Sequence, residues 1–127
     1  MNNMTEAQHA DLFGQVDDIR NALGITHAIW SFSESTVGYE GDYRQMLIDN
    51  VQFFEGRVLF VYEGGWDDEE TIQSPVIMED PHMKDVFVAA DLVLRQSNDS
   101  HHVFVEGVQD YGVNEDGVQV FNLYFGS

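Results

Sequence analysis

The sequence predicts one α+β domain over residues 1–127, with three helices packed mainly on one face of a mainly antiparallel sheet of about five strands. Three segments repeat apolar residues at three- and four-residue spacing, the pattern of amphipathic helices. Short runs rich in β-branched and aromatic residues lie between and after them and predict strands. Apolar residues make up 43% of the chain and aromatic residues 13%, so a core can form despite a formal net charge of −18.

The first helix is predicted to begin after Thr5. Thr5 and Gln8 form a capping box, in which each side chain satisfies a backbone N–H that the first turn leaves without a partner. Four apolar residues then share one helix face: Leu12, Val16, Ile19 and Leu23. Gly24 follows at the position of a left-handed C-cap, so we expect the helix to end there.

A strand and a second helix are predicted next. The segment His27–Ser33 alternates around Trp30 and favours a strand. Asp42 is a suitable N-cap for a second helix that runs to Phe54, and Gly56 is expected to end it.

The clearest strand is Arg57–Glu63. Its centre is apolar on both faces, which is typical of a strand inside a sheet rather than at its edge. Thr71–Met78 is predicted to be its antiparallel partner. Pro75 has no backbone N–H, so this partner is expected at an edge or with a bulge.

A third helix is predicted with Asp80 as its N-cap, Pro81 at its first helical position and its end near Gln96. Six residues form its apolar stripe: Met83, Val86, Phe87, Ala90, Val93 and Leu94. This helix would be a parallel crossover if the strands on either side of it run the same way, and the sheet would then be mixed.

Two strands, His101–Val108 and Gly117–Phe125, are predicted to form a closing hairpin around a polar turn at Asn114–Gly117. The last strand runs almost to the final residue. If it pairs inside the sheet, removal of even a few C-terminal residues should damage the fold.

The charge balance restricts the partners of the protein. The chain has 23 acidic and five basic residues, so it should repel nucleic-acid phosphates and anionic lipid. We therefore expect no direct nucleic-acid binding and no membrane contact. A basic protein surface or a second copy of the chain, in a homodimer, is the expected partner.

Other classes of site lack their residues. There is no cysteine, which excludes disulfides, thiolate metal sites and a cysteine nucleophile. No apolar run approaches the roughly 20 residues that span a bilayer, and the polar N-terminus does not look like a signal peptide. The expected location is the cytoplasm, and no cofactor is expected.

The segment Asp99–Gly107 holds two histidines and two carboxylates. Adjacent strand residues point to opposite faces, so His101 and His102 cannot easily bind one ion, and His102 and Glu106 lie about 13 Å apart. We expect no metal there and mainly structural roles, with His101, His102 and Glu106 as weak catalytic candidates. Glu106 would have a raised pKa if it faced the core, and would be an ordinary hydrated acid if it faced outward.

Two acidic turns are candidates for contact with a basic partner. Both lack the ligand spacing of a calcium loop. Their residues are Trp66, Asp67, Asp68, Glu69, Glu70, Asp110, Glu115 and Asp116. Solvated turns are the simpler interpretation of both.

The segment Asp99–Gly107, with the final strand ending Phe125-Gly126-Ser127, resembles small acidic bacterial proteins without an assigned activity. Such proteins are carried on mobile elements, including integron cassettes and phages. The resemblance covers roughly the last third of the chain. It implies a mobile accessory protein and implies no reaction.

Three functional hypotheses follow. The first is a non-enzymatic accessory or binding protein. The second is a nucleic-acid mimic that inhibits a DNA- or RNA-binding protein, and the third is a small hydrolase- or isomerase-like enzyme using Glu106 and a histidine. Adaptation to a saline habitat is a separate explanation of the acidity.

Overall fold

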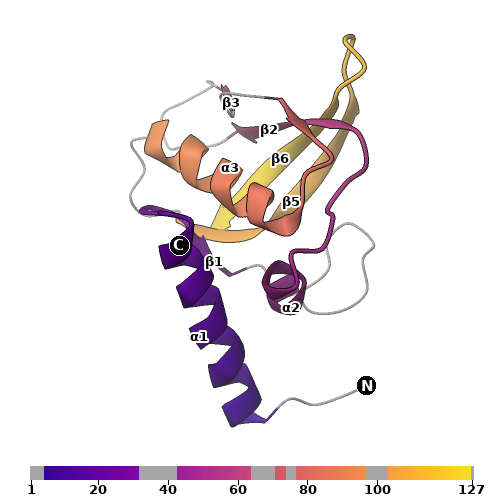
Figure 1. Ribbon diagram of the computed structural model, residues 1–127. Helices are drawn as coiled ribbons and strands as arrows, with labels where there is room; N and C mark the ends of the chain where they lie inside the picture. Colours follow the sequence, from indigo (N-terminus) through magenta and orange to yellow (C-terminus); the bar gives the residue numbers. More distant parts are fainter. Residues whose placement is uncertain (1–4, 32–42, 64–70, 74–76, 97–102, 127) are drawn as a thin grey trace.

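A computed structural model describes residues 5–31, 43–63, 71–73, 77–96 and 103–126 (Figure 1). Within them the elements run α1 Glu6–Ala22, β1 Ile29–Trp30, α2 Tyr43–Ile48, β2 Arg57–Glu63, β3 Thr71–Gln73, β4 Met78–Glu79, α3 Met83–Gln96, β5 Phe104–Val113 and β6 Gln119–Gly126. The predicted α+β class is confirmed. None of the described helices is both long and apolar enough to cross a membrane.

The strands form one mixed sheet in the order β1-β5-β6-β2-β3, with β4 also beside β2. The β5–β6, β2–β3 and β2–β4 pairs are antiparallel, whereas β1–β5 and β2–β6 are parallel. β2 is therefore an interior strand, as predicted. The strands before and after α3 run in the same direction, but β2 and β6 lie between them.

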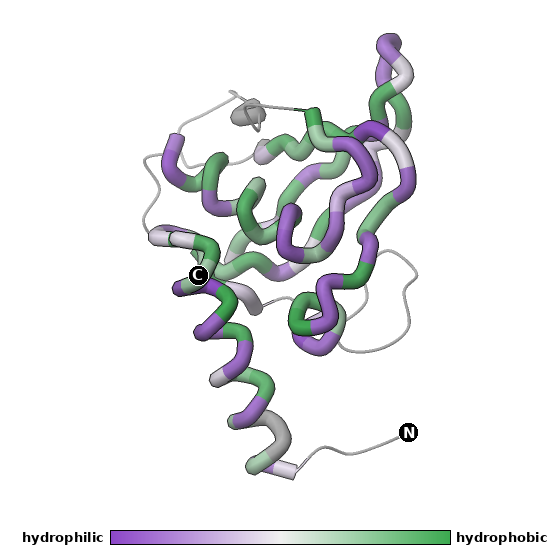
Figure 2. Tube along the Cα trace, in the orientation of Figure 1, coloured by the Kyte–Doolittle hydropathy of each residue, from purple (hydrophilic) through white to green (hydrophobic). Residues whose placement is uncertain are grey.

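The core lies between the helices and one face of the sheet. Val16 of α1, Leu47 of α2 and Val86 of α3 belong to a single buried cluster with Phe60 of β2 and Phe121 of β6. All three described helices therefore cover the same face, as the sequence predicts. Figure 1 shows α3 lying across the curled sheet, and Figure 2 shows hydrophobic positions concentrated in α3 and the strands behind it.

The second helix is shorter than predicted. It ends at Ile48, and Asn50 has a positive φ of 51°, which stops the helix six residues before the expected end. Phe53 then turns into the core, where its ring centroid lies 5.1 Å from that of Phe121, and its N–H donates to the carbonyl of Pro81 at 2.8 Å. A continuous helix would not allow this backbone bond.

The third helix begins two residues later than predicted, so Asp80 is not its N-cap and Pro81 is not inside it. Asp80 has a positive φ of 50°, and its carboxylate accepts a hydrogen bond of 2.7 Å from the N–H of Gly56. The N-terminus of α3 is capped instead by Asp85, which accepts from the N–H of His82 at 2.8 Å, and by Asn50, which accepts from the N–H of Lys84 at 3.1 Å.

The expected edge hairpin is divided into β3 and β4, both antiparallel to β2, and Pro75 lies outside the described residues. The closing hairpin is confirmed as an antiparallel pair. Its β5 strand continues five residues beyond the predicted end at Val108, so the connecting loop is shorter than expected. This extension forms the projecting hairpin in Figure 1.

Candidate functional site

The β5–β6 hairpin carries the described part of the predicted acidic contact site. Between Phe104 and Gly126 the chain has four acidic and no basic residues. Asp110, Glu115 and Asp116 are all exposed on this hairpin. The other proposed binding residues lie outside the described residues: Trp66, Asp67, Asp68, Glu69 and Glu70. The structure therefore brings together three of the eight proposed contact residues.

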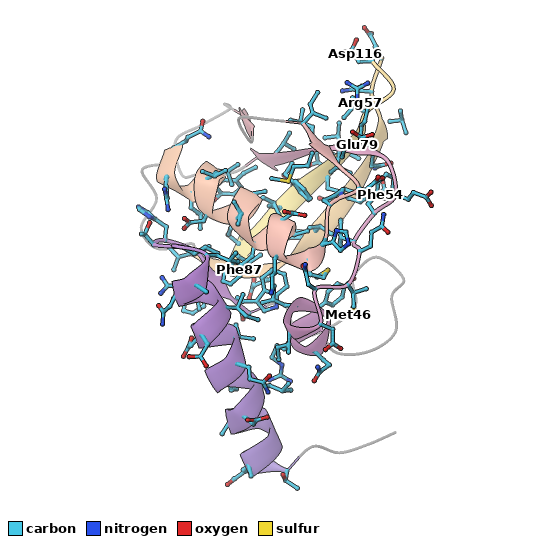
Figure 3. All side chains as sticks on the ribbon, viewed as in Figure 1. Met46, Phe54, Arg57, Glu79, Phe87 and Asp116 are labelled. Carbon is cyan, nitrogen blue, oxygen red and sulfur yellow. The ribbon has the colours of Figure 1, made fainter. Side chains whose placement is uncertain are left out.

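The tip of the hairpin is held by Asn114. Its side-chain oxygen accepts from the N–H groups of Asp116 at 2.9 Å and Val118 at 3.1 Å, and Gly117 has the positive φ of 76° that the turn needs. Within the described residues the carboxylates of Glu115 and Asp116 take no part in these bonds. Figure 3 shows Asp116 at the outer end of the hairpin, where its side chain can meet a partner.

Asp110 stabilises the backbone at the base of the hairpin. One carboxylate oxygen accepts from the N–H of Gly112 at 2.7 Å and from the side-chain amide of Gln119 at 2.6 Å. These bonds span the irregular register between Asp110 and Val113, where the strand bulges. Asp110 therefore shapes the base of the hairpin, and Glu115 and Asp116 are the better contact candidates.

Glu106 occupies a second bulge, between Val105 and Gly107. Its side chain is exposed and lies over Gly126 on the neighbouring strand, where a Cβ atom would meet the Glu106 carboxylate. Glycine at 126 thus leaves room for this carboxylate. The two other catalytic candidates, His101 and His102, lie outside the described residues. In the part of the chain that the structure describes, no three His, Asp or Glu residues are placed to hold a metal ion.

The sequence analysis did not identify Asp91, a buried acid of α3 that is only 2% exposed. Its carboxylate accepts from three successive N–H groups, those of Thr26 at 3.3 Å, His27 at 2.7 Å and Ala28 at 2.9 Å. It also forms an ion pair of 2.8 Å with Arg95. Burial raises the pKa of Asp91, whereas the three N–H donors and the charge of Arg95 together lower it by a larger amount. The net pKa is therefore below the usual value of an aspartate.

Two arginines also donate hydrogen bonds to the loop between α1 and β1. Arg20 donates to the carbonyls of Ala28 at 2.8 Å and Thr26 at 3.3 Å, and Arg95 donates to that of Gly24 at 3.0 Å. Both oxygens of Asp91 are already engaged by four donors, so the cluster stabilises the loop instead of offering a ligand. The sequence does hold a signal for this cluster. Asp91 lies four residues after Phe87 of the apolar stripe, and Arg95 follows four residues later, so all three share one side of the helix.

Comparisons with known proteins give no match for this chain, whether to a family model, a curated protein or a solved structure.

Proposed function

We propose that this protein is a non-enzymatic binding protein that docks on a basic protein surface through the tip of the β5–β6 hairpin. The observation that supports the proposal most strongly is the geometry of that tip. Glu115 and Asp116 are exposed on a turn that other atoms hold, so a partner can engage their carboxylates without disrupting the hairpin.

The strand beside the tip adds apolar contact area. Tyr111 is 44% exposed and Val113 is 65% exposed, although both are large hydrophobic residues. Interfaces commonly combine aromatic and apolar contacts with a polar rim, and opposite charges increase the rate of encounter. The hairpin offers both features to a surface rich in lysine and arginine.

The basic residues give nucleic acid little to bind. Arg20 and Arg95 donate to loop carbonyls, and Arg44 is 7% exposed with its guanidinium carbon 5.1 Å from the ring centroid of Phe13. Arg57 and Lys84 are the remaining bases of the chain. This distribution supports a cationic protein partner over a phosphate backbone.

The same features bear on the alternatives. The exposure of Glu106 favours a hydrated carboxylate over a desolvated acid–base catalyst, which supports the binding proposal over the hydrolase or isomerase alternative. A nucleic-acid mimic would need carboxylates in rows at phosphate spacing. The described exposed acids lie on several separate elements, including Glu6 and Asp17 of α1 and Asp85 of α3. A cytoplasmic accessory role, and carriage on a mobile element, remain part of this proposal.

The test compares the hairpin tip with an equal charge change elsewhere. A fluorescent oligo-lysine peptide is titrated against the wild type, a Glu115→Lys/Asp116→Lys variant and a Glu6→Lys/Asp17→Lys variant, at about 0.15 M salt. The control changes two exposed acids of α1 and gives the same net charge.

We expect the tip variant to weaken binding about tenfold more than the helix variant, which corresponds to roughly 1.4 kcal/mol. Equal weakening by both variants would show that net charge alone drives binding, and the proposed site would be wrong. Circular dichroism on each variant confirms that the comparison is between folded proteins.

A further inference from the structure

We infer that the sheet face opposite the helices is a homodimer interface, on which two copies pack face to face around a two-fold axis. Alternation along the strands defines this outer face. Trp30, Phe60 and Phe121 point into the core, so their neighbours along each strand point the other way. These outer-face neighbours include Ile29, Leu59, Val120, Tyr124, Phe104 and Gln109, and none of them belongs to the core cluster.

The outer face is apolar and exposed where β1, β5 and β6 meet. Tyr124 is 46% exposed and Ile29 is 37% exposed, whereas Asn122 and Val61, which alternation places on the same face nearer β2, are only 5% and 4% exposed. The exposed part of the face therefore lies over β1, β5 and the C-terminal end of β6, and no described helix packs there. Exposed apolar side chains gathered on one face mark an interaction surface more often than scattered ones do.

The outer face is also poor in charge. Among the described side chains, alternation places only Arg57, Glu79 and Glu106 there, in a chain with 23 acids. Two copies that each carry a net charge of −18 repel one another over most of their surfaces. The outer face is the surface on which they can approach at the lowest electrostatic cost.

The positions of the charges select a second copy as the occupant. Arg57 precedes the Val58–Gln119 pair at the hairpin end of the sheet, whereas Glu106 lies beside Gly126 at the opposite end. At strand rise they are separated by about 20 Å along the sheet. Consider a two-fold axis that lies between the two packed faces and crosses the line joining these residues at its midpoint and at a right angle. This axis places Arg57 of each copy over Glu106 of the other.

Arg57 is available for this contact. It is exposed, and although Glu79 lies opposite it in the β2–β4 ladder, the two form no ion pair within the described residues. Figure 3 shows Arg57 near the base of the projecting hairpin, with Glu79 beside it. Its guanidinium would lie between Glu79 and the partner copy's Glu106.

The size of the face sets the expected affinity. The part of β5 that lies within the sheet, Phe104–Gln109, is about 20 Å long, and four adjacent strands add a width of about 15–20 Å. The resulting area of roughly 300–400 Å² per copy is below that of stable interfaces, which bury about 800 Å² per partner. We therefore expect a weak, reversible dimer with a dissociation constant on the order of 100 μM.

Sedimentation velocity of the full chain, from about 1 to 200 μM in about 0.3 M salt, tests the dimer. The wild type is expected to shift from monomer to dimer across this range. Tyr124→Glu places a second negative charge near Glu106, in the exposed apolar part of the face, and should give a monomer, whereas Val51→Glu, which changes a 39% exposed residue outside the sheet, should dimerise like the wild type. A monomeric wild type at the highest concentration, or a Tyr124→Glu variant that still dimerises, overturns the inference.

A charge-swap cycle tests the two-fold arrangement. Arg57→Glu and Glu106→Arg should each raise the dissociation constant about tenfold, and the double swap should restore it. Asp18→Arg, at an exposed acid of α1, makes the same charge change as Glu106→Arg away from the face and should leave the dimer intact. If the double swap is weaker than both single swaps, the proposed pairing is wrong. Failure of the hairpin-tip experiment would leave this result unaffected, because the cycle alters no tip acid and uses no basic ligand.

Discussion

Asp91→Asn tests whether a buried charge holds the loop between α1 and β1. The change keeps the size of the side chain and removes its charge. The oxygen that accepts from His27 and Ala28 can be kept, but the new NH₂ group would face the Thr26 N–H and the Arg95 guanidinium, which are both donors. Two bonds are thus lost inside the protein, and two become weaker because their acceptor is neutral.

The magnitude follows from these four bonds. Hydrogen bonds to a charged group contribute about 1.5–3 kcal/mol, but the 3.3 Å bond from Thr26 is long and Arg95 is 44% exposed, so both contribute less. We expect a loss of about 3 kcal/mol in the free energy of unfolding near pH 7. Urea denaturation measures it directly. Asp85→Asn, an exposed acid of the same helix that accepts one bond from His82, should lose about 1 kcal/mol or less.

The pH dependence distinguishes the charged from the neutral form of Asp91. Because its pKa in the folded protein is below the usual 3.8, the stabilisation is complete above that pH and disappears as the pH falls through the folded value. Protonation of the other acids reduces repulsion in both proteins and largely cancels in their difference. The difference in unfolding free energy between wild type and Asp91→Asn should therefore be constant from pH 5 to 8 and shrink below about pH 4.

A difference below about 1 kcal/mol at pH 7 would refute this reasoning. It would mean that the charge of Asp91 contributes little to holding the loop at that pH. A difference that stays unchanged down to pH 2 would refute it as well, because it would show that the charge contributes nothing.

Three further predictions concern the core, the C-terminus and the surface charge. Phe121→Ala removes the ring that contacts Phe53 and Phe60, and should lower the unfolding free energy measured in urea by about 3–5 kcal/mol. The control Phe13→Ala, at a residue that is 53% exposed, should lower it by only about 1 kcal/mol. Deletion of residues 125–127 removes two paired residues of β6, including the Phe125 ring whose centroid lies 4.7 Å from that of Tyr62. Calorimetry should show that the free energy of unfolding falls by about 2 kcal/mol or more. Deletion of Ser127 alone should leave it unchanged. Raising the salt from about 10 mM to 1 M shortens the Debye length from about 30 to 3 Å, so Tm should rise, and a Tm independent of salt would contradict destabilising repulsion.

The sequence predicted those features that depend on neighbouring residues. The apolar stripe of α3 and the glycine turn of the closing hairpin are local patterns, and the structure confirms both. The beginning of α3 was predicted wrongly because Asp80 bonds to Gly56, 24 residues earlier, and a distant partner leaves no local signal. The end of α2 was missed because burial of Phe53 favours a bend that helix propensity does not reveal.

The same distinction applies to the candidate site. Glu115 and Asp116 were proposed because acids in a polar turn are expected at the surface, and both are exposed there. Asp91 was missed because its backbone partners lie 63 to 65 residues earlier in the chain. A buried acid on an apolar helix face indicates that a partner exists, but the sequence does not identify it.

The positions of the few basic residues make the surface more acidic than the composition alone suggests. Arg44 is nearly buried and Arg95 is paired with the buried Asp91, so neither offsets much of the exposed acidity, and the charge of Arg20 is shared with the neutral carbonyls of one loop. The charge thus favours cationic partners over most of the molecule and opposes contact between identical copies. The inferred dimer would avoid most of this repulsion by using the charge-poor outer face. The acidic hairpin tip lies at the end of the same sheet, so a dimer formed on that face would present two tips to basic partners and increase their avidity.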